Sequence, residues 1–324
     1  FAQHKAIPLN SILSSLLKHL EAQSPCFCWE QRDPLSTPLL SEAPFQTRFV
    51  AFNPSEVLRI QGGRLEHERL TDATGQPLHS PQSLYTGYTS KAIFSYLEQQ
   101  LQSRILPRHD NGSSELPAFY GGYAGFYGYD MVQYEEPIAF AAPDNNTPDA
   151  LFYRFDQVVV FNESPTGIQA TLYVHPHPTL RKTNTPEPLQ REALESHAEA
   201  LSQKLAQELA HLLQAAILPP DSDTASETTD IQQHMQIQHK QPLHGQPTLG
   251  KARFCEQVAT LQNAIQRGDI FQAVLSERFT ATTTTSPLEL YTRLHQVNPS
   301  PYHFYLNLPE ISMLGASPEM LVRQ

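Results

Sequence analysis

The chain has 324 residues, of which 40% are hydrophobic and 17% are charged, proportions that are ordinary for a globular protein. Its formal net charge of −11 argues against a nucleic-acid partner, because the sequence has no basic stripe that would neutralise phosphates. No apolar run approaches the length of a membrane span, so no membrane partner is expected, and the chain is long enough to form more than one lobe.

The N-terminal residues predict an amphipathic helix and not a secretory signal. Apolar residues recur at helical spacing over residues 10–20. Lys5, Pro8 and Lys18 interrupt the continuous apolar run that a signal peptide needs.

The chain contains 3 cysteines, too few for a disulfide framework. Cys26 and Cys28 alternate with Phe27 as they would in a strand, and Cys255 lies far along the chain. No second pair of metal ligands accompanies Cys26 and Cys28. We therefore interpret all the cysteines as free thiols of a protein in the reducing cytoplasm.

Strands are predicted after the first helix, where short apolar segments are bounded by turn residues. The predicted strands cover residues 26–30, 48–52, 56–61 and 64–70. Gly62 and Gly63 supply the turn between the last two. A helix is predicted over residues 90–105, where apolar side chains recur at helical spacing.

Residues 119–130, FYGGYAGFYGYD, have the most unusual composition in the chain, with four glycines and six aromatic residues. This composition is typical of a buried bend where backbone approaches backbone and aromatic rings pack over the glycines. A phosphate-binding loop is the alternative interpretation, but no Gly-Lys-Ser/Thr segment follows. We therefore favour the bend.

Two adjacent strands, residues 153–161 and 168–174, are predicted next, and then a long amphipathic helix over residues 192–217. Residues 218–250 are polar and cannot bury enough surface to become ordered by themselves, so they predict a flexible linker. The predicted divisions are an N-terminal regulatory lobe at 1–217, the linker at 218–250 and the start of a second domain at 251–324.

The last part of the chain predicts helices and strands in turn. A helix over residues 252–267 ends at Gly268, which tolerates the left-handed backbone of a C′ position. A strand is predicted over residues 270–280, and a capping box starts a helix over 288–297. A strand meander follows at residues 304–308, 311–314 and 320–322. The predicted fold class is α+β, with antiparallel, sandwich-like β-sheets flanked by helices.

Several segments form a pattern in a fixed order. They are CFCWEQ at 26–31, GGYAGFYGYDMVQYEE at 121–136, PDALFYRFDQVVVF at 148–161, GDIFQAVLSERF at 268–279, NPSPYHFYL at 298–306 and GASPEMLVR at 315–323. Together they resemble the chorismate-utilising enzymes, and among these most of all the family of anthranilate synthase component I. The resemblance spans nearly the whole chain and is more specific than any single motif.

The resemblance implies conversion of chorismate to anthranilate and pyruvate, with ammonia supplied by a separate glutaminase subunit. It also implies Mg²⁺ held by two glutamates at the ring carboxylate of chorismate. In the family the metal glutamates and most chorismate contacts follow the segment that matches residues 315–323. We therefore expect the catalytic residues downstream of Gln324 and no metal ligands within the chain. The chain is then an incomplete chorismate-binding fold, an amino-terminal portion that is inactive by itself.

The resemblance further implies a feedback site for L-tryptophan. The positions that match it are Glu30, Gln31, Asn298, Pro299, Pro301, Tyr302 and His303. In this prediction Glu30 pairs with the ammonium group of the ligand, and Tyr302 offers a flat apolar wall to the indole. Judged by residue types alone, the same segment is more typical of a proline-rich loop that leads into a strand, and it is its position in the family pattern that favours the effector site.

Three departures from the family pattern fall within this predicted site. Gln31 stands where family members commonly have serine, and His303 replaces the adaptable methionine of the loop. Arg48 is followed by Phe49 and Val50, where the family has tyrosine and serine. We therefore expect tryptophan binding to be weakened, changed in ligand or lost.

Two other functions stay open at this point. Aminodeoxychorismate synthase component I, of the folate pathway, uses the same substrate and shares the fold implied by the resemblance. A non-catalytic module that senses an amino acid or docks a partner is the second alternative, although the strands predicted after residue 298 would then leave unpaired edges. An alanine in a downstream Pro-Ile-Ala-Gly-Thr segment would favour the anthranilate enzyme, and a lysine in its place the folate enzyme.

Overall fold

The computed structural model describes residues 9–22, 24–31, 47–71, 77–88, 95–96, 98–100, 117–138, 147–164, 167–175, 245–298 and 300–318, with separate residues between 196 and 210. These residues belong to two compact units. One unit comprises Phe1–Leu218 together with Pro287–Gln324, and the other comprises Pro219–Ser286.

A large antiparallel sheet forms the centre of the first unit. Its continuous path is β11-β10-β1-β2-β3-β4, and β6 attaches to β2 and carries β5 and β7. The strands are β1 Cys26–Gln31, β2 Thr47–Gln61, β3 Arg64–Thr71, β4 Pro77–Tyr88, β5 Gly122–Tyr127, β6 Ala150–Ser164, β7 Gly167–Val174, β10 Tyr302–Asn307 and β11 Ser312–Ser317. The prediction of antiparallel strands with helices on them is confirmed.

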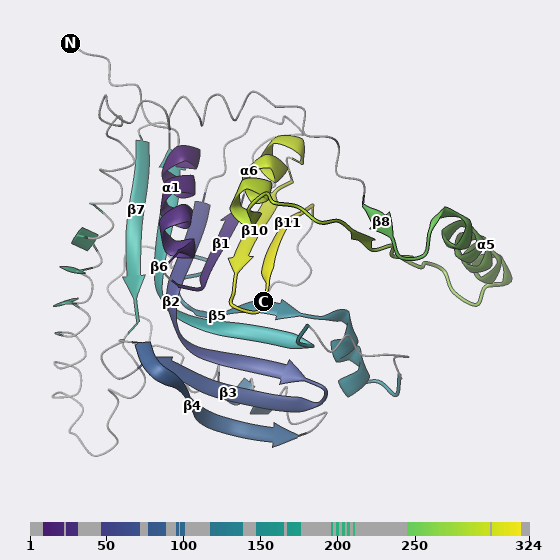
Figure 1. Cartoon of the computed structure of the whole chain (residues 1–324), viewed down its shortest axis with the longest axis horizontal. Helices are drawn as coiled ribbons and strands as arrows, with labels where there is room; N and C mark the ends of the chain where they lie inside the picture. Colours follow the sequence, from purple (N-terminus) through teal and green to yellow (C-terminus); the bar gives the residue numbers. More distant parts are fainter. Residues whose placement is uncertain are drawn as a thin grey trace, which may run out of the picture. The chain divides into compact units, whose positions relative to one another are not determined.

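The long strands β2 and β6 are shared by two halves of this sheet. In the first half they pair with β1 and β7, and in the second half with β3 and β5. The register between β2 and β6 shifts at a bulge between Pro54 and Glu56. Figure 1 shows β2 turning from the direction of β1 into that of β3 along this course. The sequence predicted two strands here, at 48–52 and 56–61. They form one strand, because a bulge accommodates a proline without ending the pairing on either side.

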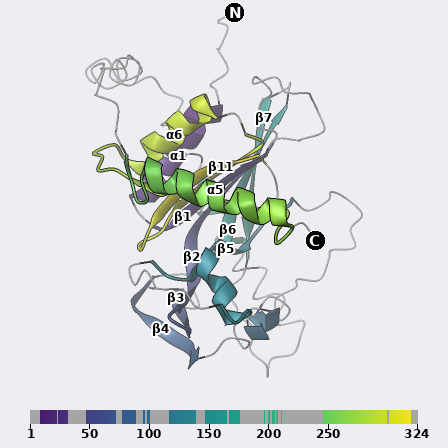
Figure 2. The ribbon, with the colours of Figure 1, turned by 90° about the vertical axis from the view of Figure 1, so that its right-hand side faces the viewer.

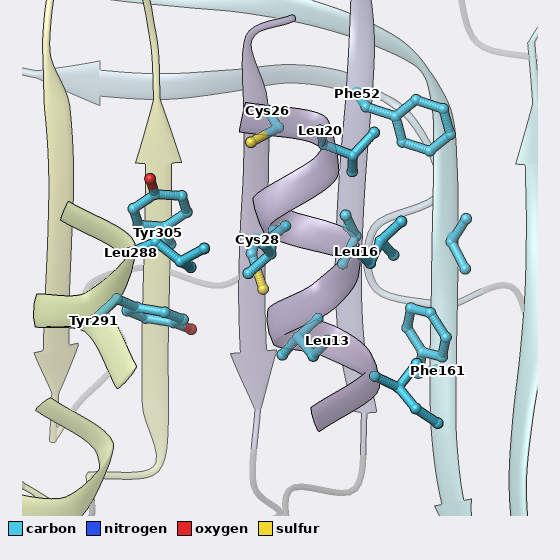
Figure 3. Close-up of a cluster of buried hydrophobic side chains, with 14 residues drawn as sticks. Leu13, Leu16, Leu20, Cys26, Cys28, Phe52, Phe161, Leu288, Tyr291 and Tyr305 are labelled. Atoms are coloured by element: carbon cyan, nitrogen blue, oxygen red, sulfur yellow. The ribbon is translucent and has the colours of Figure 1, made fainter. Parts of the chain in front are cut away.

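Helices α1 Leu9–Glu21 and α6 Pro287–Val297 lie side by side on one face of the first half (Figures 1 and 2). Both were predicted within one or two residues of their bounds. The buried residues of α1 are Ile12, Leu13, Leu16, Leu17 and Leu20, spaced as one face of a helix. Figure 3 shows α1 lying across β1, where Cys26 and Cys28 face it, while Tyr291 of α6 lies near Tyr305 of β10. None of the three cysteines forms a disulfide.

The opposite face of the first half packs against the second half. One apolar cluster contains Phe49 and Ala51 of the first half together with Leu151, Tyr153 and Phe155 of the second. The bent sheet therefore encloses its own core, which is the sandwich-like arrangement that the sequence predicted.

A group of polar side chains is buried beside the β2 bulge. His67 Nε2 lies 3.1 Å from Oε2 of Glu56, and His67 Nδ1 lies 2.6 Å from the hydroxyl of Tyr96. The Tyr123 hydroxyl donates to the same Glu56 oxygen at 2.8 Å, and Arg154 Nη1 lies 3.8 Å from Oε1. Since Glu56, His67, Tyr123 and Arg154 come from β2, β3, β5 and β6, these contacts brace the bend of the sheet.

The glycine and aromatic segment forms β5 and the 3-10 helix η1 Tyr129–Tyr134 that follows it. The predicted close approach of backbones is confirmed at Gly125, where a Cβ atom would overlap the carbonyl oxygen of Leu151 in β6. The aromatic residues do not all pack over glycines, because Tyr127 is 52% exposed and Tyr129 is 86% exposed. Tyr127 is the last residue of β5, where its ring packs edge-on against that of Phe152, and Tyr129 is the first residue of η1.

The second unit contains α5 Lys251–Arg267 and a short hairpin of β8 Gln246–Pro247 with β9 Phe279–Thr280. Gly268 follows α5 with φ 78° and ends it as predicted. The carboxylate of Glu277 accepts backbone N–H groups of Thr248, Leu249 and Gly250 at 2.8 to 3.2 Å, just before the helix begins.

The strand predicted over residues 270–280 is wrong for most of its length. Only Phe279 and Thr280 are in a strand, and they pair with the two residues of β8. Phe271 is 92% exposed and Val274 is 88% exposed. A strand needs neighbours for its backbone groups, and the described part of this unit offers residues 270–278 no neighbouring strand.

The division into units differs from the predicted divisions at residues 218–250 and 251–324. Pro287–Gln324 joins the N-terminal unit, because β10 pairs with β1 and α6 packs on the same sheet. Most of the predicted linker and the strand at 320–322 lie outside the described residues. The predicted helices at 90–105 and 192–217 are described only at scattered positions, and those positions are helical.

Candidate functional site

The candidate site is built around Glu30, a buried carboxylate of the first unit. Alternation along β1 turns Glu30 to the face that carries α1 and α6, and its side chain is completely buried. Its cross-strand neighbours are Arg48 on β2 and His303 on β10. The antiparallel register thus brings a cation and an imidazole to the same level of the sheet.

Three side chains contact the Glu30 carboxylate. Arg48 Nε donates to Oε2 at 2.6 Å. The hydroxyl of Tyr291 donates to Oε1, and His295 Nε2 lies 2.7 Å from the same oxygen. Burying a carboxylate costs free energy unless it is paired and hydrogen-bonded, and these contacts supply both kinds of compensation.

Helix α6 supplies two of the three contacts with the Glu30 carboxylate. Tyr291 and His295 are four residues apart and therefore project from the same side of the helix. The ring of His295 stacks on that of His303, with centroids 4.1 Å apart and planes inclined by 23°. His303 is completely buried. We call Glu30, Arg48, Tyr291, His295 and His303 the Glu30 cluster.

Arg48 links the Glu30 cluster to other elements. Its Nη2 donates to Oδ1 of Asn10 in α1 at 2.9 Å. Its Nη1 lies 3.8 Å from Oε2 of Glu163, which belongs to β6. The cluster therefore joins α1, α6 and strands β1, β2, β6 and β10.

The surroundings of each group determine its charge. Burial alone would raise the pKa of Glu30, but the hydrogen bond and charge of His295, together with the charge of Arg48, hold that pKa below its usual value. Burial raises the pKa of the Tyr291 hydroxyl far above its ordinary value, and it does the same to the pKa of the Cys28 thiol beside it. The carboxylate is thus ionised while its tyrosine and cysteine neighbours keep their protons.

The other predicted site residues are neighbours of this cluster along the chain, but alternation along β1 and β10 turns the side chains of Gln31 and Tyr302 to the opposite face of the sheet from Glu30 and His303. Gln31 pairs in register with Tyr302, so the two matched segments lie side by side. Asn298 lies just beyond α6, where its Oδ1 accepts the Ser300 hydroxyl at 2.7 Å. Pro301 is half-buried immediately before β10. Pro299 lies outside the described residues. Their role in binding an effector stays a prediction.

Sequence reasoning did not find Tyr291 and His295. They lie outside the loop that carries the family pattern, and the segment was interpreted only as a helix. The signal was the spacing, because Leu288, Tyr291 and His295 recur at helical intervals and bring two polar groups to the apolar face. A polar group at such a position calls for a buried partner.

The described residues contain no group of three or more histidine, cysteine, aspartate or glutamate side chains that could hold a metal ion. No step of a reaction is assigned to a metal within them. Among the helices of the described part, none is long and apolar enough to cross a membrane.

Comparison with known proteins identifies the family of the chain. The sequence profile of the chorismate binding enzymes matches residues 24–324, which is nearly the whole chain. The chain therefore belongs to the chorismate binding enzymes.

Several similar proteins carry the name anthranilate synthase component 1. The protein named anthranilate synthase component 1 of Acetivibrio thermocellus is 29% identical over 209 residues, or 64% of this chain, and the protein of that name from Synechocystis is 29% identical over 277 residues, or 85%. A crystal structure of anthranilate synthase component I from Streptococcus pneumoniae matches 98% of this chain with a TM-score of 0.52 at 23% identity, which supports the fold alone. The chain spans 38% and 48% of the two relatives and 58% of the solved chain.

Proposed function

We propose that this chain is the amino-terminal part of an anthranilate synthase component I. The reaction converts chorismate and ammonia to anthranilate, pyruvate and water, the first step of tryptophan biosynthesis. The observation that carries the proposal is the family match over residues 24–324, joined to relatives named anthranilate synthase component 1. In this proposal the protein works in the cytoplasm with a glutaminase subunit, which releases ammonia from glutamine.

The chemistry explains why the described residues are not expected to suffice. Chorismate carries two carboxylates, so its site needs a cation and fixed hydrogen-bond donors, and the loss of the ring hydroxyl needs a general acid. The buried acid of the Glu30 cluster is already engaged by Arg48, Tyr291 and His295. We therefore propose that the catalytic groups and the Mg²⁺ ligands belong to a further part of the protein.

Exposed apolar residues of the second unit support the proposal that a further part of the protein is needed. Its segment GDIFQAVLSERF leaves Phe271 and Val274 about nine-tenths exposed. Large apolar side chains at such exposure mark a surface that another part of a protein covers. In our proposal the further part of the chorismate-binding domain packs on this segment and completes the sheet.

The first test is to read the coding sequence past Gln324 and to assay both proteins. We expect the longer protein to form anthranilate from chorismate, ammonium and Mg²⁺, as followed by anthranilate fluorescence. The 324-residue chain is expected to form none, and chorismate without protein is the control. A stop codon directly after Gln324 would overturn the proposal. So would a product that keeps the enolpyruvyl group, since this is the product of the folate enzyme.

We also propose that the feedback site has lost its high affinity for tryptophan. The ammonium group of an amino acid would have to take the place of His295 at the Glu30 carboxylate, where His295 Nε2 now lies at 2.7 Å. It would also meet the buried imidazole of His303 instead of an apolar side chain. Displacing a satisfied buried contact uses up the free energy that the ligand gains there.

Titration calorimetry with L-tryptophan tests this statement directly. We expect a dissociation constant weaker than about 1 mM, which corresponds to a binding free energy smaller than about 4 kcal/mol. The double variant Gln31→Ser with His303→Met is expected to bind more tightly than the native chain. Exposed His79→Gln is the control and should change nothing. Binding of tryptophan by the native chain at low micromolar concentration would contradict the proposal.

A further inference from the structure

The stacked rings of His295 and His303 form a contact between α6 and the sheet, and the strength of this contact depends on the charge of the two rings. His303 belongs to β10 and is completely buried, whereas His295 belongs to α6 and keeps 19% of its side chain exposed. Their rings are 4.1 Å apart and nearly parallel. His295 also lies against the Glu30 carboxylate, at 2.7 Å.

Among the described residues, charged and polar groups approach the pair from several neighbouring elements. From β1 come Glu30 and the thiol of Cys28, from β2 Arg48, and from β6 Glu163. Helix α6 adds the Tyr291 hydroxyl, β10 adds Tyr305, whose hydroxyl donates to Glu21 of α1, and α1 adds the neutral amide of Asn10. The charges of Arg48 and Glu30 already balance each other, and Glu163 is a further carboxylate that these contacts bring near.

The number of protons on the two histidines therefore determines how strongly α6 is held against the sheet. One proton on His295 strengthens the contact with Glu30, because a charged donor binds a carboxylate more strongly than a neutral one. A second proton, on His303, places two imidazolium rings face to face inside the protein, beside the guanidinium of Arg48. Like charges at this separation in a poorly solvated interior repel each other strongly.

We propose that the histidine pair makes the docking of α6 on the sheet depend on pH. The helix stays docked while the pair carries at most one proton, and it is released when both rings are protonated. A released helix leaves both imidazoles in water, where they take up protons more readily than in the buried stack, so acidification favours the released helix. Helix α6 begins at Pro287, directly after the last residue of the second unit, Ser286.

The thiol of Cys28 offers a direct measure of this release. It is buried between α1 and α6 (Figure 3), where the Tyr291 hydroxyl shares a hydrogen bond with it, so release of α6 uncovers one side of the thiol. We propose to follow its reaction with a thiol reagent in the full chain, with the exposed Cys255 changed to serine. Native protein and the His303→Met variant are compared at the same pH, so that the pH dependence of the reagent cancels in the ratio of their rates.

We expect this ratio, native over His303→Met, to increase as the pH falls from about 7.5 to about 5.5, by up to about tenfold per pH unit for one proton. His303→Asn, which keeps a polar group that does not titrate, should behave like His303→Met. His79→Gln, which removes an exposed histidine, should behave like the native chain. The native chain should lose protection at Cys28 before Cys26, because Cys26 lies toward α1 and Glu21.

Two results would overturn the proposal. One is a ratio that stays constant with pH, which would mean that His303 takes no part in the release. The other is equal labelling of Cys26 and Cys28 at every pH, which would mean that the whole unit opens and not α6 alone. The test involves neither chorismate nor tryptophan, so its outcome is independent of the proposed reaction.

Discussion

Replacing Arg48 by methionine is expected to lower the free energy of unfolding by about 3 to 5 kcal/mol. Arg48 and Glu30 are both buried, and Arg48 Nε lies 2.6 Å from the Glu30 carboxylate. Methionine keeps much of the volume of the side chain but removes its charge, so Glu30 loses the cation on one of its oxygens. The same change removes the hydrogen bond to Asn10 that ties the start of α1 to the sheet.

Urea denaturation of matched variants tests this prediction. Arg293→Met removes an exposed pair with Glu289 on the surface of α6 and should cost less than about 1 kcal/mol. The double variant Glu30→Gln with Arg48→Met should be more stable than Arg48→Met alone, because no buried carboxylate is then left without its guanidinium partner. If Arg48→Met and Arg293→Met cost the same, the buried pair does not stabilise the fold.

The pH dependence of the free energy of unfolding provides a further test of the pair of Glu30 and Arg48. The pKa of Glu30 is held below its ordinary value by His295 and Arg48, against the opposing effect of burial. A carboxyl group with a lowered pKa stabilises the folded state above its unfolded pKa and loses this contribution as pH falls through the folded value. The difference in stability between the native chain and Arg48→Met should therefore shrink as the pH falls below the unfolded pKa of a glutamate, about 4.3.

Local signals in the sequence were sufficient for much of the fold. Helices α1, α5 and α6 have apolar residues at helical spacing, and Gly268 ends α5 with the left-handed backbone that its lack of a side chain permits. The strands β6 and β7 were visible as apolar runs joined by a short turn. These features depend on residues that are neighbours in the sequence, and such features are the ones a sequence pattern contains.

The features that sequence reasoning missed depend on pairing over long distances. Residues 270–278 have the apolar content of a strand, yet a strand exists only where a neighbour is present to pair with it. The continuity of β2 past Pro54 could not be read locally either, because it rests on β6, whose register resumes after the bulge.

The candidate site shows the same limit. The family pattern identified Glu30 and His303, which the register of β1 and β10 does bring together. The contact between Tyr291 and Glu30 joins residues 261 positions apart, and no pattern within either segment specifies it. Residue type gave only the general expectation that a buried carboxylate has partners.

Replacing Gly125 by alanine is expected to destabilise the first unit by about 3 kcal/mol or more, at the upper end of what overpacking costs. A Cβ atom at this position would overlap the carbonyl oxygen of Leu151 and lie 2.8 Å from the Cα atom of Phe152. Both atoms belong to the backbone of β6, and they cannot yield as a flexible side chain would. Strand β6 is also paired with β2 at these positions, so a shift of β6 would disturb the register of the central strands.

A second glycine separates this steric effect from the loss of conformational freedom. Gly62 has φ +55°, and a Cβ atom added to it would meet nothing within 4 Å. Gly62→Ala therefore costs only the left-handed backbone, about 1 to 2 kcal/mol. Urea denaturation of Gly125→Ala and Gly62→Ala should differ clearly, with Gly125→Ala the less stable. Equal costs would mean that β5 can move away from β6 without loss. In that case the close backbone contact does not hold the glycine and aromatic segment in the sheet, and another feature must explain why its four glycines are there.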